Sequence, residues 1–557
     1  MKRLILLIFL LIIFAGNCQA SYNNNKFGIH LAQPNDDDLK SAAALVNSNG
    51  GQWGYVTLVI QENDRDRNRW QEIFDKMREL KLIPIIRIAT NVDGDAWTRP
   101  KKDDADNWSN FLNSLNWVVK QRYIILFNEP NQSKEWGGIV DPYDYIETTK
   151  IYAEKIKAKN PDFFIMMAGL DAAAPSEMPY FEGESYFLKG IFEKISPSDF
   201  EKLFDGWASH SYPNPGFAGS PYATGRNSIR NYEWELELLK GFGINKNLPV
   251  YITETGWSAN SVSRDTIANN YQIAFNNWLT DDRVKAVTPF VLNYQGEPFL
   301  GFSWRQYNSN DFYNQYDTVR SLDKVKGKPQ ISEKGRIDYQ LPSHLLIDSD
   351  YSFTVKLSNF GQGIWDSDDN YYLRLNNLEG RIIFPKLQDI KPKETDEIEF
   401  YIKTNSQKGQ RKIRINLVKD DKKIIEGKEW RVYLDPLPSL KLNLVLYLKR
   451  KADAKDYELQ VFDEQEKLVY QKKNLEVKLG NSLVENIHNV IPENKYRVVI
   501  LKPYYLPRQA IILFNNKDNT VSFKKLLPLD FNADGKFSLN DFSALMKNLR
   551  LLKMFLP

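Results

Sequence analysis

The first half of the chain alternates short apolar runs with amphipathic stretches, and this alternation restricts the fold more than any other feature of the sequence. The runs have the composition of strands that are buried on both faces. The eight runs span residues 27–31, 55–60, 82–89, 123–127, 164–168, 206–209, 250–253 and 286–292. Helices are predicted between them, for example over 69–80 and 145–159. Eight strand–helix units in about 290 residues match the size of a (β/α)8 TIM barrel, the α/β fold that we expect.

A doubly wound open sheet is the competing fold for this pattern. A sheet of that kind carries a glycine-rich phosphate loop directly after its first strand. Residues 28–34, Gly-Ile-His-Leu-Ala-Gln-Pro, do not provide such a loop. The barrel is therefore the favoured interpretation.

Length and charge exclude several classes of protein. The chain has 557 residues, and at roughly 150 residues per domain this corresponds to about three to four domains. With 42% apolar and 26% charged residues, global disorder, collagen and a polytopic membrane protein are not expected. Residues 21–330 carry a net charge of −6 and residues 331–557 a net charge of +7. Because binding to a phosphate backbone needs a cationic face, we expect no nucleic-acid partner.

The N-terminus resembles a secretory signal peptide over residues 1–20. A basic tip precedes an apolar run over 4–16, and the small residue Ala20 precedes a polar stretch. The run is shorter than the roughly 18–20 residues that span a bilayer. Cleavage after Ala20 removes Cys18, the only cysteine, so no intrachain disulfide and no thiolate zinc site can form. We expect a secreted or surface-attached protein; an uncleaved anchor and a lipid-modified Cys18 are the alternatives.

The pattern changes after about residue 327. Strands now alternate polar and apolar residues, as in 351–357 and 396–402, and no long helix lies between them. This predicts two antiparallel β-sandwiches, over 340–436 and 441–528, behind a barrel domain at 21–330. The last segment, 529–557, is predicted to be a short EF-hand-like loop and helix.

Two glutamates end strands of the predicted barrel. Asn128 and Glu129 end the fourth strand and Glu254 ends the seventh. Active sites of such barrels are built at the carboxyl ends of the strands, so both carboxylates are expected in one cleft. One protonated and one ionised carboxyl group are what glycosidic bond cleavage requires.

On these residues the region 27–304 resembles clan A glycoside hydrolases, the superfamily that contains families 5 and 39. The resemblance implies a retaining enzyme that cleaves β-linked polysaccharides or oligosaccharides without a cofactor. It implies Glu129 as acid/base and Glu254 as nucleophile. It also implies that Asn128 binds the 2-hydroxyl of the substrate.

Further residues fit the resemblance as substrate contacts. His210 and Tyr212 are similar to the His-x-Tyr of family 5, whose tyrosine bonds the nucleophile. Trp304 resembles the tryptophan on which the sugar stacks. Arg87 is the candidate for the arginine near the nucleophile, although it lies on the third strand rather than the second. His30 ends the first strand at the same mouth.

Several tryptophans lie in or next to the strand-end loops, and their rings could stack on pyranose rings. These are Trp53, Trp97, Trp136, Trp257 and Trp304. Core packing is the alternative for each of them. For His30, His210 and Arg87 the alternatives are a satisfied barrel histidine or a salt-bridged core arginine.

The rear domains resemble accessory modules of extracellular proteins. Residues 357–365, with Trp365, resemble an Ig-like sandwich, for which a spacer role is favoured over sugar binding. Residues 496–506 resemble a prealbumin-like sandwich, to which we assign no chemistry.

The C-terminal segment fits a 12-residue calcium loop. Oxygen ligands fall at loop positions 1, 3, 5, 7 and 12, with glycine at position 6. The predicted ligands are Asp530, Asn532, Asp534, Lys536 through its carbonyl, and Asp541. A helix is predicted over 541–551. The segment resembles one half of a dockerin, so a cohesin-like partner is considered, but the sequence has no second loop. A polar loop without metal is the alternative.

The prediction is therefore a secreted retaining glycosidase, with a structural calcium ion in its tail. The rival is a non-catalytic carbohydrate-binding or adhesion protein on the same barrel. For the enzyme we expect the two carboxyl groups roughly 5–5.5 Å apart. The sugar and the linkage are not identified by the sequence.

Overall fold

A computed structural model describes residues 24–447 and 452–548. The chain divides into one unit that ends at Ser332 and a second that begins at Glu333. The predicted signal peptide, with Cys18, lies outside the described residues. Within the described ranges, no helix combines the length and the apolar character that a membrane span requires.

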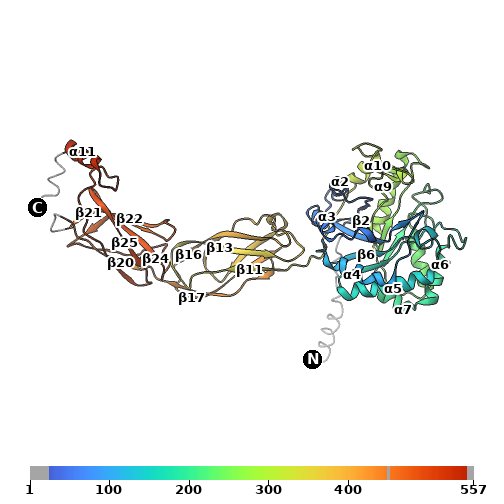
Figure 1. The fold of residues 1–557 in the computed structure, drawn as a ribbon, viewed down its shortest axis with the longest axis horizontal. Coiled ribbons are helices and arrows are strands. Elements are labelled where there is room, and N and C mark those ends of the chain that lie inside the picture. The colour runs from blue at the N-terminus through green and yellow to red at the C-terminus, as the bar shows by residue number, and fades with distance from the viewer. Residues whose placement is uncertain (1–23, 448–451, 549–557) are drawn as a thin grey trace, which may run out of the picture. The chain divides into compact units, whose positions relative to one another are not determined.

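The core of the first unit consists of parallel strands (Figure 1). One sheet has the order β1-β2-β3-β6-β7, and a second has the order β10-β9-β8. The strands are β1 Gly28–His30, β2 Gly54–Gln61, β3 Leu82–Ala89, β6 Arg122–Leu126, β7 Phe163–Met167, β8 Trp207–His210, β9 Val250–Glu254 and β10 Val284–Val287. Single parallel bridges, Phe27 to Val287 and Met166 to Gly206, join the two sheets at both edges. The prediction of a parallel-sheet core is confirmed.

The last predicted strand, over 286–292, is wrong in its extent. β10 ends at Val287, and Pro289 follows two residues later. Proline has no N–H to donate to a strand ladder, so regular pairing stops before it. The chain then returns to β1 through irregular bonds: the N–H of His30 donates to the carbonyl of Pro289.

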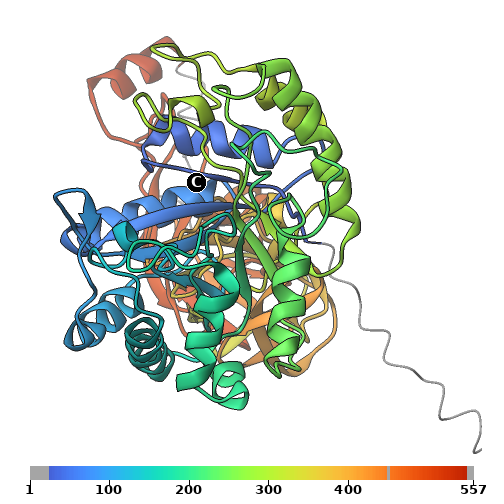
Figure 2. The same ribbon diagram turned by 90° about the vertical axis from the view of Figure 1, so that its right-hand side faces the viewer.

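Helices lie outside the strands of this unit (Figures 1 and 2). They are α2 Asp36–Val46, α3 Arg67–Glu79, α4 Ala105–Ser114, α5 Pro142–Lys159, α6 Glu184–Lys194, α7 Pro197–Leu203, α8 Asn231–Gly241, α9 Arg264–Thr280 and α10 Asn314–Ser321. Side-chain caps fix several starts. Asp66 accepts bonds from two backbone N–H groups of α3, and Ser263 accepts one at the start of α9. Such caps satisfy N–H groups that have no partner within the helix.

The front part of the second unit is built from mostly antiparallel strands. One sheet has the order β11-β13-β16-β15 and the other β12-β19-β17-β14, with β18 on β17. The strands are β11 Gly335–Tyr339, β12 His344–Leu346, β13 Asp350–Asn359, β14 Tyr371–Asn376, β15 Gly380–Ile383, β16 Thr395–Thr404, β17 Gly409–Lys419, β18 Lys422–Glu426 and β19 Trp430–Asp435. Alternate residues of β16 are buried, as the alternating sequence predicts. Trp365 is buried in this core, and its Nε1 donates to Glu333 at 3.2 Å.

The rear part has a separate core between two further sheets. Their orders are β23-β20-β26 and β22-β21-β24-β25. The strands are β20 Ser439–Asn443, β21 Ala454–Phe462, β22 Leu468–Val477, β23 Asn481–Val484, β24 Lys495–Lys502, β25 Tyr505–Leu513 and β26 Asp518–Ser522. The helix α11 Leu539–Lys547 starts two residues before the predicted helix, because Ser538 and Asp541 form a capping box there.

Candidate active site

Glu129 stands on a sharp turn of the backbone directly after β6. Phe127 has φ of +73° and Glu129 has φ of +27°, both in the left-handed region that non-glycine residues rarely adopt. Each such residue costs of the order of 1–3 kcal/mol and persists only where its surroundings fix it. Here the N–H of Glu129 donates to the carbonyl of Gly169, which follows β7. Residues with strained backbone angles are found more often at functional sites than elsewhere.

The structure brings Glu129 and Glu254 together. Glu254 is the last residue of β9 and is 8% exposed. One carboxylate oxygen of each glutamate and one ring nitrogen of His210 all lie within 4.8 Å of one another. The two carboxylates predicted to share a cleft therefore face each other.

Both oxygens of Glu254 accept hydrogen bonds. Nη1 of Arg87, on β3, donates to Oε1 at 2.7 Å, and the hydroxyl of Tyr212 donates to Oε2 at 3.0 Å. Burial raises the pKa of Glu254, but the positive charges of His210 and Arg87 outweigh it and lower the pKa to about 2. Glu254 is therefore ionised at any ordinary pH.

The environment of Glu129 has the opposite effect. Its Oε1 lies 2.7 Å from Nδ1 of His210, and its Oε2 accepts from Gln132 at 2.9 Å. Burial raises the pKa of Glu129, and the charges of Asp171 and Glu254 add to this against the pull of His210. Burial lowers the pKa of His210, but Glu254 and Glu129 outweigh it and raise that pKa. Glu129 and His210 together therefore retain a proton to higher pH than an isolated glutamate and an isolated histidine would.

Gly169 makes room for His210. A Cβ atom at position 169 would lie 2.3 Å from Cδ2 of the His210 ring. Only glycine therefore allows the ring to occupy its place beside Glu129.

His30 lies at the same mouth, at the end of β1. Its Nε2 is 3.9 Å from Oε1 of Glu254. Burial lowers the pKa of His30 to about 3, so the ring is uncharged above that pH. Among the described residues neither ring nitrogen has a hydrogen-bond partner.

Arg87 links Glu254 to Asn128. It donates from the same Nη1 to the side-chain oxygen of Asn128, and both residues line a small cavity together with Glu135. Burial and the charge of Glu129 raise the pKa of Glu135 to about 7, against the opposing effects of Arg87 and Asn128.

Three of these residues were missed by sequence reasoning, namely Gln132, Glu135 and Asp171. Gln132 and Glu135 come three and six residues after Glu129 in the same strand-end loop, and Asp171 comes four residues after β7. The signal that could have identified these residues is that they are polar and lie in strand-end loops. Glu135 lies in a short helical turn, Ser133–Glu135, that returns it to the cleft.

Trp304 and Trp257, which the sequence suggests as substrate contacts, are buried in the structure. Each is 1% exposed. The Trp304 ring packs 4.9 Å from the ring of Tyr271 on α9, and Trp257 donates from Nε1 to the carbonyl of Gly219. Both residues follow strand ends, but their rings pack against Tyr271 of α9. Trp136 is also fully buried.

Phe290 is an aromatic ring that lies next to His30 at the site. It is half-buried, and its centroid lies 5.1 Å from the ring of His30 and 5.2 Å from that of Phe299. Aromatic faces of this kind suit the apolar face of a sugar ring.

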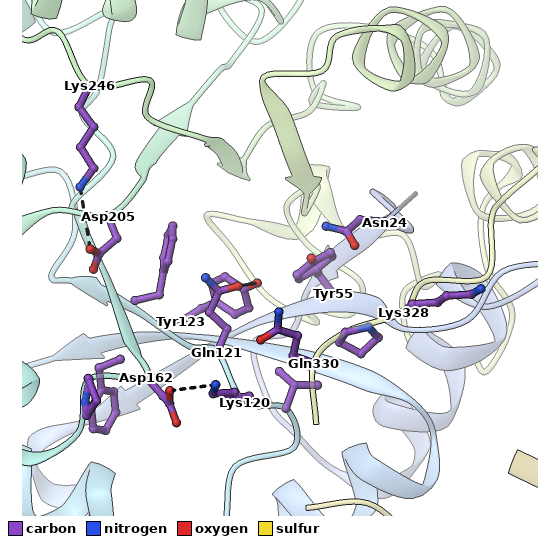
Figure 3. Close-up of a pocket in the computed structure, with 15 residues that line it drawn as sticks. Asn24, Tyr55, Lys120, Gln121, Tyr123, Asp162, Asp205, Lys246, Lys328 and Gln330 are labelled. Atoms are coloured by element: carbon purple, nitrogen blue, oxygen red, sulfur yellow. Dashed lines mark hydrogen bonds and ion pairs between the residues drawn. The ribbon is translucent and has the colours of Figure 1, made fainter. Parts of the chain in front are cut away.

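A larger cavity lies at the other end of the strands (Figure 3). It has a volume of about 550 Å³ and is lined by Tyr55 and Tyr123, near the first residues of β2 and β6. Four of its charged residues form pairs, Lys120 with Asp162 and Lys246 with Asp205, and Lys328 also lines the cavity. Glu129 and Glu254 follow the opposite ends of their strands, so this cavity is not part of the site.

Within residues 24–447 and 452–548, two groups of side chains have the spacing of metal ligands. In the first, Glu129, His210 and Glu254, both oxygens of Glu254 are already occupied by Arg87 and Tyr212, so a cation would have to displace a guanidinium group. The second group is Asp530, Asp534 and Asp541, with oxygens within 4.8 Å of one another. No residue in the described ranges bonds to Oδ1 of Asp530, which is buried.

The other two predicted ligands lie in the same loop. The side-chain amide of Asn532 donates to Asp534 at 2.8 Å, and the N–H of Lys536 donates to the other oxygen of Asp534 at 2.9 Å. The donor set of this loop, three carboxylates of which Asp530 keeps one unpartnered buried oxygen, fits a hard cation such as calcium.

Comparisons with known proteins give no family for the chain. No protein-family model matches it, and no curated protein matches it. Among solved structures, a family 39 glycoside hydrolase from Bacteroides cellulosilyticus WH2 is 12% identical, with a TM-score of 0.38 over 69% of this chain and 81% of that one. A GH5_18 protein from Streptomyces cattleya is 14% identical, with a TM-score of 0.40 over 58% of this chain and 84% of that one.

A family 51 α-L-arabinofuranosidase from Bifidobacterium longum is 11% identical, with a TM-score of 0.36 over 69% of this chain and 95% of that one. These neighbours are glycoside hydrolases, but a likeness of this degree carries no argument about activity. The argument for function rests on the geometry of the site.

Proposed function

We propose that the first unit is a retaining glycoside hydrolase on a (β/α)8 barrel, which cleaves β-linked glycans by double displacement. Glu254 is the nucleophile and Glu129 is the acid/base. The observation that supports this is a pair of facing carboxyl groups, within 4.8 Å at their nearest oxygens, whose pKa values are shifted in opposite directions.

The short separation favours retention over inversion. Inverting enzymes hold their carboxyl groups about 6.5–9.5 Å apart to leave room for a water, whereas retaining enzymes hold them about 5–5.5 Å apart. Oxygens within 4.8 Å of each other match the retaining separation better than the inverting one. A direct attack by Glu254 on the sugar is the chemistry that fits.

In the first step an oxygen of Glu254 forms a bond to the anomeric carbon while the bond to the leaving oxygen breaks. Glu129 gives its proton to that leaving oxygen. In the second step Glu129, now ionised, takes a proton from a water that attacks the same carbon and releases Glu254. His210, 2.7 Å from Glu129, keeps a proton near that carboxyl group between the steps.

Arg87 and Tyr212 hold the nucleophile ionised and oriented. Each donates to a different oxygen of Glu254, so the carboxylate has a fixed plane. A fixed plane directs a lone pair at the anomeric carbon, which lowers the entropic part of the barrier.

The experiment that tests this removes each glutamate in turn. Glu254→Gly should abolish turnover of every β-glycan in a substrate panel, and azide should partly restore cleavage by filling the vacated space. Glu129→Ala should be mild for aryl glycosides whose leaving group needs no proton and severe for natural glycans. Glu177→Gln, which changes an exposed carboxylate, is the matched control.

The rival function is carbohydrate binding without catalysis. If the wild type hydrolyses no β-glycan and binds one with the same affinity as both variants, the protein is a lectin-like barrel and the enzymatic proposal fails.

We propose for the tail a structural calcium site formed by Asp530, Asn532, Asp534, Asp541 and the carbonyl of Lys536. The buried, unpartnered Oδ1 of Asp530 supports it. Calcium added to the full chain should protect amide hydrogens of residues 530–541 from exchange, because carboxylates gathered without a cation repel one another. Asp530→Asn should lose this protection and Asp396→Asn, an exposed change in the same unit, should keep it. Equal protection with calcium and with chelator would contradict the site.

Export and the accessory modules complete the proposal. The N-terminal segment supports secretion or surface attachment, and the two antiparallel parts of the second unit are proposed as an Ig-like and a prealbumin-like spacer. A cohesin-like partner is tested by passing the calcium-loaded chain over immobilised cohesins; with a single loop we expect no capture.

A further inference from the structure

A row of aromatic rings leads away from the nucleophile along the segment that follows β10. The N–H of Phe290 donates to the carbonyl of Thr255, the residue directly after Glu254, at 2.9 Å. The Phe290 ring lies 5.1 Å from the ring of His30, whose Nε2 is 3.9 Å from Oε1 of Glu254. Phe290 is therefore tied to the neighbourhood of the nucleophile both by its backbone and by its side chain.

The row continues outward from Phe290. The ring centroid of Phe299 lies 5.2 Å from that of Phe290 and 5.3 Å from that of Tyr294, and each of the two neighbouring rings stands at 83° to it. Although two rings hold it, Phe299 is 39% exposed. Single exposed apolar side chains are common on protein surfaces, whereas adjoining apolar rings that reach a cleft are typical of ligand-binding grooves.

The segment that carries these rings is held by backbone hydrogen bonds on three sides. Within the segment, the N–H of Trp304 donates to the carbonyl of Val291 at 3.0 Å. Toward β1, the N–H of Leu292 donates to the carbonyl of His30 at 2.9 Å, and the carbonyl of Gly301 accepts a bond from the loop after β9 at 3.0 Å. The rings are therefore in place before a ligand arrives, so less free energy is lost to ordering when it binds.

The row lies on the side of the cleft opposite Glu129. Around the two joined sheets, β1, β2 and β3 lie between β10 and β6 in one direction, and β7, β8 and β9 lie between them in the other. Glu129 follows β6 and protonates the leaving oxygen in the proposed mechanism, so the leaving group lies on the β6 side. The part of the substrate on the other side of the cleaved bond therefore extends toward β10.

The chemistry of these rings matches a chain of sugars. The C–H groups of a pyranose form an apolar face, and an aromatic ring packs on such a face without needing a hydrogen bond. Phe290 lies beside the sugar whose anomeric carbon Glu254 attacks. Phe299 lies one ring farther from the nucleophile, which is the direction in which the next sugar of a linear chain follows.

We propose that Phe299 forms a stacking site for a second sugar, on the non-reducing side of the sugar that Glu254 attacks. The substrate class is therefore a β-linked oligosaccharide or polysaccharide with at least two sugars on that side of the cleaved bond, rather than a single terminal sugar. This inference rests on the proposed function, since it assigns a substrate length to the same cleft.

The test compares two substrates that differ only in the number of sugars on this side. The probes are the aryl β-glycosides of the monosaccharide and of the disaccharide of the sugar that the β-glycan panel selects. Because the leaving group is the same aryl group in both, the ratio of the two kcat/KM values reports the second sugar alone. One aromatic contact is worth roughly 3- to 10-fold in kcat/KM.

In the wild type, kcat/KM for the disaccharide glycoside should exceed that for the monosaccharide glycoside by at least this factor. Phe299→Ala should lower the ratio by about 3- to 10-fold, and Phe299→Tyr, which keeps the ring, should retain it. Phe360→Ala, which removes an exposed phenylalanine of the second unit, is the matched control and should keep the wild-type ratio. Thermal melting checks that each variant is folded.

Two results would overturn the inference while leaving the proposed function intact. One is equal kcat/KM for the two glycosides in the wild type, since no site then binds the second sugar. The other is a ratio in Phe299→Ala that equals the wild-type ratio, since the second sugar is then held elsewhere. If wild type cleaves no glycoside at all, the proposed function fails and this inference fails with it.

Discussion

Replacing Arg87 with methionine tests how the nucleophile is kept ionised. Arg87 is buried, with its side chain 12% exposed, and its Nη1 lies 2.7 Å from Oε1 of Glu254. Methionine retains much of the volume but removes the charge. Coulomb's law at an effective dielectric constant of about 20 gives an attraction of roughly 6 kcal/mol at this distance. The desolvation of both groups offsets part of it.

An opposite charge at this range lowers the pKa of a carboxyl group by roughly 1–3 units. In Arg87→Met the pKa of Glu254 should therefore rise from about 2 toward its ordinary value of 4.5. In the wild type the low pKa stabilises the fold above pH 4.5, by about 3 kcal/mol, and this contribution is lost as the pH falls through about 2. The variant should lose much of that stabilisation at pH 7 and little of it at pH 2.

The assay is the pH dependence of kcat/KM for an aryl glycoside whose leaving group needs no proton. With such a substrate the rate of bond cleavage does not depend on the protonation of Glu129. The acid limb of this profile reports the free enzyme's nucleophile. It should move into the range of about pH 3–5 in the variant. Arg65→Met is the matched control, since Arg65 forms a 2.8 Å ion pair with Asp104 outside the site. An acid limb that stays below pH 3 in Arg87→Met would refute the reasoning.

Three further predictions follow from contacts of the site. Gly169→Ala should push the His210 ring away from Glu129 and lower kcat, and the alkaline limb of its pH profile should move to higher pH, because His210 lowers the pKa of Glu129; an unchanged profile would show that the ring is not displaced. Asp171→Asn removes a charge that raises the pKa of Glu129, so here the alkaline limb should move to lower pH, with the melting temperature little changed. Trp304→Ala should lower the free energy of unfolding by about 3–5 kcal/mol, as expected of a core ring, whereas Phe290→Ala should mainly raise KM.

The pairing of Glu129 with Glu254 was predictable because of one geometric rule. Parallel strands place their carboxyl ends at the same edge of a sheet, so a residue that ends β6 and one that ends β9 meet regardless of the sequence between them. Tyr212, two residues after β8, follows the same rule. The same rule places Arg87 near this edge of the sheet, but only the resemblance suggested that Arg87 lies next to Glu254.

The rule does not say which way a side chain turns after its strand ends. Trp304 and Trp257 follow strand ends as Tyr212 does, yet their rings fill space around Tyr271. That choice depends on the volume left by α9, a long-range packing property that no local pattern contains. Glu135 was missed for a similar reason: only the turn Ser133–Glu135 brings it back to the cleft.

The left-handed backbone at Phe127 and Glu129 has a consequence for how this protein changes over many generations. Phe127 packs on Trp136 and Tyr152 in the core, so a glycine there would lose more through the cavity than the strain it releases. At Glu129 a glycine would release of the order of 1–3 kcal/mol of backbone strain. Mutations at Glu129 are thus among those that can make the domain more stable, so a screen for heat resistance without a screen for turnover should accumulate changes there.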